Sequence, residues 1–115
     1  MNIIIAGDGK VGATLTRLLA AEGHNITLID TNLRVLETSQ ENYDVMAVHG
    51  NCAAMETLLQ AGVRSAELLI AATNADEVNI LCCTTAHGLN PMLHTIARIR
   101  NPEYTNQIYK DYVHQ

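Results

Sequence analysis

Short apolar runs alternate along the chain with longer segments in which apolar residues recur every three or four positions. The runs are rich in Ile, Val and Leu, a pattern typical of strands that are buried on both faces of a sheet. We therefore expect five strands, at residues 2–6, 25–29, 45–48, 68–72 and 94–99.

The segments between these runs have helical periodicity. In the first segment Val11, Leu15, Leu18 and Leu19 lie at i, i+4, i+7 and i+8, which places them on one stripe of a helix. Glycines follow or end three of the segments, as is common at helix C-termini. The expected helices are 10–22 before Gly23, 31 or 32 to about 41, 53–61 before Gly62, 75–87 before Gly88, and a last one from Tyr104 to Val113.

The strict alternation of strands and helices through short links predicts an α/β fold. Right-handed β-α-β crossovers then give a doubly wound parallel sheet of the Rossmann type. Such a sheet usually has a sixth strand, and the pattern contains five. We expect residues 1–115 to form a single domain with one hydrophobic core, and to be part of a longer chain.

Composition narrows the classes of protein. Hydrophobic residues make up 48% of the chain and charged residues 17%, as in a folded protein, and the net charge of -5 disfavours nucleic-acid binding. No apolar run reaches the ~20 residues of a membrane span, and no basic segment precedes the first apolar run as in a signal peptide. The three cysteines, two of them adjacent, indicate packed thiols in the reducing cytoplasm.

A glycine motif carries the first candidate chemistry. The pattern G-x-G-x-x-G follows the first expected strand and opens the first expected helix, at Gly7, Asp8, Gly9, Lys10, Val11 and Gly12. In this context Gly7 allows a tight turn, Gly9 lets a pyrophosphate approach, and Gly12 lets the helix pack on the sheet. Free N–H groups at the helix start would bind the phosphates. Lys10 could reach a phosphate or point into solvent.

An acidic residue, Asp30, closes the second expected strand 18 positions after Gly12. Its carboxylate is suited to accept hydrogen bonds from ribose hydroxyls. The same charge would repel a 2′-phosphate, and neither Thr31 nor Asn32 supplies a cation to offset it. NADP is therefore disfavoured relative to NAD, ATP or ADP.

Polar residues also follow the other strands, where ligands of open α/β sheets bind. These residues are Asn51 after the third strand, Thr73 and Asn74 after the fourth, and Arg98 and Arg100 at the end of the fifth. The two arginines are two positions apart, so on a strand they share a face and could clamp phosphates together. The alternative for them is a set of surface ion pairs. Asn74 or Asp76 could also act only as a helix cap.

No catalytic constellation can be assembled from the remaining residues. The five histidines have no metal-ligand spacing, so no metal site is expected, and no substrate domain is present for hydride transfer. We therefore expect a binding module rather than an enzyme. Two alternatives remain: the cofactor domain of an NAD-dependent oxidoreductase, and an S-adenosylmethionine methyltransferase, whose ligand has no phosphate for the arginines.

The chain resembles the N-terminal domain of the RCK/KTN family of potassium-conductance regulators. The resemblance rests on the glycine motif, on Asp30, on the polar residues after the other strands, and on the segments 72–79 and 97–104. The resemblance extends over essentially the whole chain. It implies an adenine nucleotide, NAD(H), ATP or ADP, at the glycine loop, with its ribose on Asp30. It also implies that Thr73, Asn74 and Arg98 complete the site, with Arg100 as a terminal-phosphate contact. Asn51 stands where the family often has an acidic residue.

The resemblance further implies a function and partners. Family members lie in the cytoplasm at the inner face of the cell membrane, form dimers or rings, and gate a membrane-embedded potassium transporter. Apolar residues cover nearly the whole circumference of the expected helix 75–87, so this helix is either deeply buried or packs against another subunit. We expect nucleotide binding to bias the packing of subunits through it.

Overall fold

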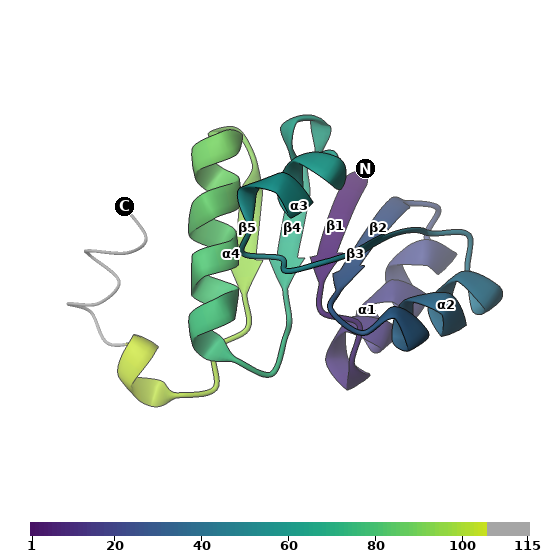
Figure 1. Cartoon of the computed structure of the whole chain (residues 1–115), viewed down its shortest axis with the longest axis horizontal. Coiled ribbons are helices and arrows are strands. Elements are labelled where there is room, and N and C mark those ends of the chain that lie inside the picture. The colour runs from purple at the N-terminus through teal and green to yellow at the C-terminus, as the bar shows by residue number, and fades with distance from the viewer. Residues whose placement is uncertain (106–115) are drawn as a thin grey trace.

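The computed structural model describes residues 1–105 and contains a five-stranded sheet with helices on both faces (Figure 1). All neighbouring strands are parallel, and their order is β3-β2-β1-β4-β5. The strands are β1 (Asn2–Ala6), β2 (Asn25–Asp30), β3 (Met46–His49), β4 (Leu68–Ala71) and β5 (His94–Ala97). The predicted doubly wound Rossmann-like fold is confirmed.

Four α-helices and two 3₁₀ turns connect and follow the strands. They are α1 (Lys10–Ala21), α2 (Leu33–Asn42), α3 (Met55–Gln60), the turn η1 (Val63–Ser65), α4 (Asp76–Leu89) and the turn η2 (Pro102–Thr105). Asn32 caps α2, since its side chain accepts a hydrogen bond from the N–H of Arg34. No helix of the described residues is long and apolar enough to cross a membrane.

Several predicted boundaries differ from the structure by one or two residues, and two of these differences have a clear physical reason. Helix α4 continues through Gly88 to Leu89, because Gly88 does not adopt the positive φ that ends a helix and Pro91 disfavours the helical conformation one residue before it, at Asn90. Strand β5 ends at Ala97 rather than at residue 99, because the backbone beyond it is hydrogen-bonded to Asp76 instead of to a strand. Of the last predicted helix, Tyr104 lies in η2 and residues 106–115 lie outside the described part of the chain.

The core consists of two layers, one on each face of the sheet. Ile3 and Ile5 pack with residues of α1 and α2, whereas Ile4 packs with residues of α3 and α4. All three side chains are at most 2% exposed. This explains why the first strand has an uninterrupted apolar sequence, because both of its faces are covered.

The strand order reverses at β1, which has β2 on one side and β4 on the other. The connections from β1 and β4 therefore leave in opposite directions, and a crevice opens beyond the carboxyl ends of the strands. The glycine loop lies at this crevice. Gly7 has φ +99°, and a Cβ on Gly12 would lie 1.7 Å from the carbonyl oxygen of Gly7. Both positions require glycine for this close turn.

Candidate functional site

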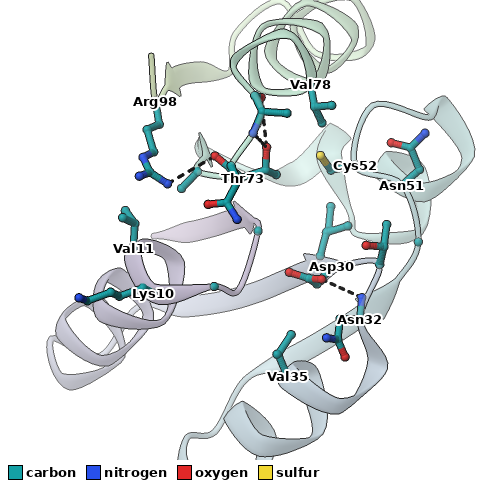
Figure 2. Close-up of a pocket in the computed structure, with 18 residues that line it drawn as sticks. Lys10, Val11, Asp30, Asn32, Val35, Asn51, Cys52, Thr73, Val78 and Arg98 are labelled. Atoms are coloured by element: carbon teal, nitrogen blue, oxygen red, sulfur yellow. Dashed lines mark hydrogen bonds between the residues drawn. The ribbon is translucent and has the colours of Figure 1, made fainter. Parts of the chain in front are cut away.

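A cavity of about 640 Å³ lies beyond the carboxyl ends of the strands (Figure 2). This volume is within the range of small-molecule binding sites. Nine of the predicted site residues line it: Gly7, Gly9, Lys10, Val11, Asp30, Asn51, Thr73, Asn74 and Arg98. Asp8, Gly12 and Arg100 are not part of its lining. The fold thus gathers residues from across the sequence into one site.

The glycine loop presents backbone to the cavity. Gly9 is the N-cap of α1 and has no side chain to satisfy the first N–H groups of the helix. A Cβ on Gly9 would meet nothing within 4 Å, so the space in front of the loop is open. The N–H groups of a helix start, together with the positive end of the helix dipole, favour an anion at this position. Figure 2 shows the Lys10 side chain extending away from Asp30.

Asp30 is held in place by backbone N–H groups of the loops that follow β1 and β2. One oxygen, Oδ2, accepts a hydrogen bond from the N–H of Asp8 at 2.7 Å, and Oδ1 accepts one from the N–H of Asn32 at 2.7 Å. Each carboxylate oxygen retains a further lone pair for a donor in the cavity. The carboxylate is therefore preorganised to accept hydrogen bonds from a ligand.

Asp8 contributes its backbone to the site, while its side chain points elsewhere. The side chain is 4% exposed, and its Oδ2 accepts a hydrogen bond from Ser39 Oγ at 2.6 Å. Among the described residues Oδ1 has no hydrogen-bond partner. Burial raises the pKa of Asp8, the Ser39 hydroxyl opposes that effect, and the nearby charge of Asp30 adds to it. Sequence alone did not reveal this buried carboxyl.

Asn79, in the second turn of α4, organises the opposite wall. Its Oδ1 accepts hydrogen bonds from the N–H and the hydroxyl of Thr73, at 2.9 and 2.7 Å. Its Nδ2 donates to the carbonyls of Thr73 and Arg98, at 3.1 and 2.9 Å. The side chain is fully buried. One amide thus joins the ends of β4 and β5 and places Thr73 beside Arg98 (Figure 2).

The two predicted arginines both follow β5, which ends at Ala97. Asp76 accepts hydrogen bonds from the N–H groups of Arg100 and Asn101, at 2.9 and 2.7 Å. This turns the chain away from the sheet after Ala97, so the alternation of a strand no longer applies. Arg98 lines the cavity and Arg100 does not. The predicted strand that would have given the two arginines a shared face is therefore wrong, and a phosphate contact of Arg100 stays a prediction.

The hydrogen bonds of Asp76 also decide its own role. The N-cap of α4 is Ala75, without a side-chain cap, so neither Asn74 nor Asp76 acts as the helix cap considered from the sequence. The two N–H donors, that of Arg100 first, lower the pKa of Asp76, and the positive charges of the two arginines act in the same direction. Asp76 is a scaffold for the loop that carries Arg98.

Apolar side chains complete the cavity. Val35 comes from the first turn of α2, Val78 from the first turn of α4, and Cys52 from the loop after β3. Sequence reasoning did not assign these residues to the site. A signal was present, because each is an apolar residue shortly after the end of a strand. Such an apolar wall suits a flat ring with apolar faces, such as a nucleotide base.

The electrostatic character of the cavity changes from one side to the other. Asp30 supplies negative charge at the β2 end, and Arg98 supplies positive charge at the β5 end (Figure 2). Among the described residues neither forms a salt bridge. The arrangement offers an acceptor for hydroxyls and donors for phosphates in one cavity. In this part of the chain no three His, Cys, Asp or Glu residues are placed to hold a metal ion.

Comparison with known proteins is consistent with this architecture. The family model described as the TrkA-N domain matches residues 3–115. The chain is 41% identical over 104 residues to the Trk system potassium uptake protein TrkA of Vibrio alginolyticus, an alignment that covers 90% of this chain and 23% of that protein. The chain therefore spans about a quarter of the length of such relatives.

Two solved structures are similar over most of the chain. The Kef C-terminal domain of Shewanella denitrificans in its AMP-bound form has a TM-score of 0.83 and 28% identity, and the match covers 98% of this chain and 68% of that one. The TrkA-N domain of the inner membrane protein ybaL of Escherichia coli also has a TM-score of 0.83, with 26% identity, over 89% of this chain and 75% of that one.

Proposed function

The chain belongs to the TrkA-N domain family, and on that premise we propose that it is a nucleotide-sensing domain of a potassium-uptake regulator. Its ligand is an adenine nucleotide, NAD(H), ATP or ADP, bound in the cavity beyond the strand ends. It acts as a regulatory module and not as an enzyme. The observation that carries the proposal is a single cavity with the glycine loop at its base, Asp30 on one side and Arg98 on the other.

Each part of an adenine nucleotide has a matching surface. The ribose hydroxyls donate to Asp30, whose carboxylate is already oriented by two backbone N–H groups. The phosphates lie over the start of α1, at the open space in front of Gly9. The base lies among Val35, Val78 and the loop of Asn51. The similar Kef structure was solved with AMP, which agrees with this class of ligand.

The charge distribution favours nucleotides without a 2′-phosphate. Such a phosphate would lie against the Asp30 carboxylate, and no cation lines the cavity beside Asp30 among the described residues, since Thr31 and Asn32 follow it in the chain. We expect NADP to bind more weakly than NAD for this reason. Thr73, Asn74 and Arg98 contact the phosphates, and Arg100 reaches the terminal phosphate from outside the lining.

The function of the full protein follows from its relatives. The Vibrio alginolyticus relative named a potassium uptake protein is about four times as long as this chain, so the transporter partner belongs to the proposal. We infer that the protein works in the cytoplasm at the inner face of the membrane, as a homodimer or a higher ring, and controls a membrane-embedded potassium transporter. Nucleotide binding controls transport if it stabilises one arrangement of the subunits more than another.

Thermal denaturation with ATP, ADP, NAD, NADH and NADP tests nucleotide binding. A ligand at about 100 times its Kd adds ~2.7 kcal/mol to the free energy of unfolding. We expect a clear rise of the melting temperature with the first four ligands, and a smaller one with NADP at the same concentration. A protein whose melting temperature responds to none of the five contradicts the proposal.

Two variants connect the response to the cavity. Asp30→Asn keeps a carbonyl acceptor and removes the charge, so NAD binding weakens and the preference over NADP declines. Arg98→Gln weakens the response to ATP more than the response to NAD, because ATP carries more phosphate charge. Asp44→Asn is the matched control, since Asp44 is exposed and lies outside the cavity. Oxidation or reduction of the nicotinamide with any substrate would instead support an oxidoreductase.

A further inference from the structure

Two thiols from distant parts of the chain meet at the wall of the cavity. Cys52 lines the cavity and Cys82 lies in α4. Val78, one helical turn before Cys82 and on the same face of α4, also lines the cavity. Both cysteines belong to the same buried cluster, 5% and 0% exposed, and their sulfurs are in hydrogen-bond contact. Cys82 therefore contacts Cys52 but is not part of the cavity lining.

The environment distinguishes Cys52 from the other two thiols. The hydrogen bond from the Cys82 thiol lowers the pKa of Cys52, whereas the same contact and burial raise the pKa of Cys82. Burial raises the pKa of Cys83 to about 11, and its thiol contacts Thr95 instead. Since the thiolate is the reactive form, Cys52 is the nucleophile of the three, and only Cys52 faces the cavity.

We propose that Cys52 and Cys82 form a redox-sensitive thiol pair that a peroxide reaches through the nucleotide cavity, and that their disulfide weakens nucleotide binding. The regulatory half of this inference rests on the proposed function. The chemistry of the pair is independent of it. All three cysteines are free thiols in the structure.

The reaction consumes one peroxide and two thiols. The Cys52 thiolate attacks one oxygen of hydrogen peroxide, the O–O bond breaks, and the leaving hydroxide takes up a proton to become water. The resulting sulfenic acid of Cys52 is then attacked by the sulfur of Cys82, which loses its proton as a second water leaves. Two electrons pass from the two sulfurs to the peroxide, and the product is a Cys52–Cys82 disulfide.

The disulfide acts on the side of the cavity proposed for the base. A hydrogen-bonded pair of sulfurs is separated by well over 3 Å, whereas a disulfide requires about 2.05 Å. Forming the bond pulls the loop of Asn51 and Cys52 toward α4 and changes the wall that includes Val78. A bound nucleotide, in turn, covers Cys52 and slows its oxidation.

Mass spectrometry after treatment with hydrogen peroxide tests the thiol chemistry. We expect the wild-type protein to lose two hydrogen atoms and to yield one non-reduced peptide pair that joins Cys52 to Cys82. In Cys82→Ser the reaction stops at a sulfenic acid on Cys52, which dimedone traps. Cys83→Ser is the matched control, a buried thiol on the same helix, and it forms the disulfide as wild type does. Failure of wild type to form the Cys52–Cys82 bond overturns the proposal.

Binding of ADP by the reduced and oxidised protein tests the regulatory half. We expect oxidation to raise the Kd for ADP by about tenfold, and dithiothreitol to restore it. Cys52→Ala keeps its affinity after peroxide treatment, and ADP at saturation protects wild-type Cys52 from oxidation. An unchanged Kd in the disulfide form overturns control of binding. If the reduced protein does not bind ADP, the proposed function and this control both fail, while the peptide map still decides whether the pair is redox-active.

Discussion

Single residues in the glycine loop are constrained to different degrees. A Cβ at position 12 would lie 1.7 Å from the backbone carbonyl of Gly7, and backbone cannot move aside as a flexible side chain can. At position 9 a Cβ has free space and the backbone has φ −79°, which other residues adopt. Gly12 is thus required by packing, and Gly9 by the proposed ligand.

Alanine at these two positions should separate folding from binding. We expect Gly12→Ala to lower the free energy of unfolding by more than about 2 kcal/mol, because the loop and α1 must separate. Gly9→Ala should change it by less than about 1 kcal/mol but weaken nucleotide binding, because its methyl group occupies the phosphate position. Urea denaturation and nucleotide titration measure the two effects. Equal loss of stability in both variants would contradict this assignment.

The buried carboxyl of Asp8 should make stability depend on pH. Its pKa is raised in the folded protein, chiefly by burial, so the folded state favours the protonated acid. The stability associated with this group is present below its unfolded pKa of 3.8 and is lost as the pH rises through its folded pKa. Asp8→Asn keeps an acceptor for Ser39 and removes the charge.

The melting temperatures of wild type and Asp8→Asn test this over a range of about pH 4 to pH 8. The melting temperature of the variant should rise relative to that of wild type as the pH rises, because only wild type must ionise a buried acid. Subtracting the two curves removes the opposite slopes of Asp76 and Glu77, whose pKa values are lowered in both proteins. A difference that stays constant with pH would show that Asp8 does not titrate in this range.

At the scale of elements, α4 connects the two strand ends that complete the cavity. Asn79 binds the ends of β4 and β5, and Asp76, three residues earlier on the same face, binds the chain after β5. The conformation of these loops therefore depends on one face of α4. Sequence periodicity identified the helix, but a buried asparagine in an apolar helix does not by itself indicate which loops it binds.

Asn79→Ala should weaken both folding and binding. The substitution leaves the N–H of Thr73 and the carbonyl of Arg98 without their buried partner, which costs about 3 kcal/mol of the free energy of unfolding. Loosening of Thr73 and Arg98 also reduces nucleotide affinity. Asn42→Ala is the matched control, since Asn42 is exposed and donates to Thr38 within its own helix, and it should change stability by less than about 0.5 kcal/mol. Similar losses in the two variants would contradict the role of Asn79.

At the scale of the whole molecule, α4 has a second, outward face. Cys82, Cys83 and Ala86 are buried against the sheet, whereas Leu81 is 54% exposed. The helix therefore combines the two possibilities that the sequence left open, since one face is buried and an apolar residue is exposed on the other. This outward face is the part of α4 that can contact another subunit.

Leu81→Glu should reduce self-association of the protein. A charge at the centre of an apolar contact is costly to bury, so the proposed dimer or ring of this variant should dissociate at a higher protein concentration than that of wild type. Leu18→Glu is the matched control, because Leu18 in α1 is 50% exposed. Sedimentation at several concentrations measures the effect, and equal association of Leu81→Glu and wild type would exclude this face.

The sequence by itself determined the fold class, the order of strands and helices, the glycine loop and Asp30 at the end of β2. These features follow from local periodicity and from glycines whose steric role depends on neighbours in the chain. Three-dimensional packing decided the features that join distant residues. It buried Asp8 against Ser39, fixed the backbone of Arg100 on Asp76, and brought Cys82 into contact with Cys52. Such contacts depend on how helices pack on the sheet, and sequence periodicity specifies which face of a helix is buried but not which side chains meet there.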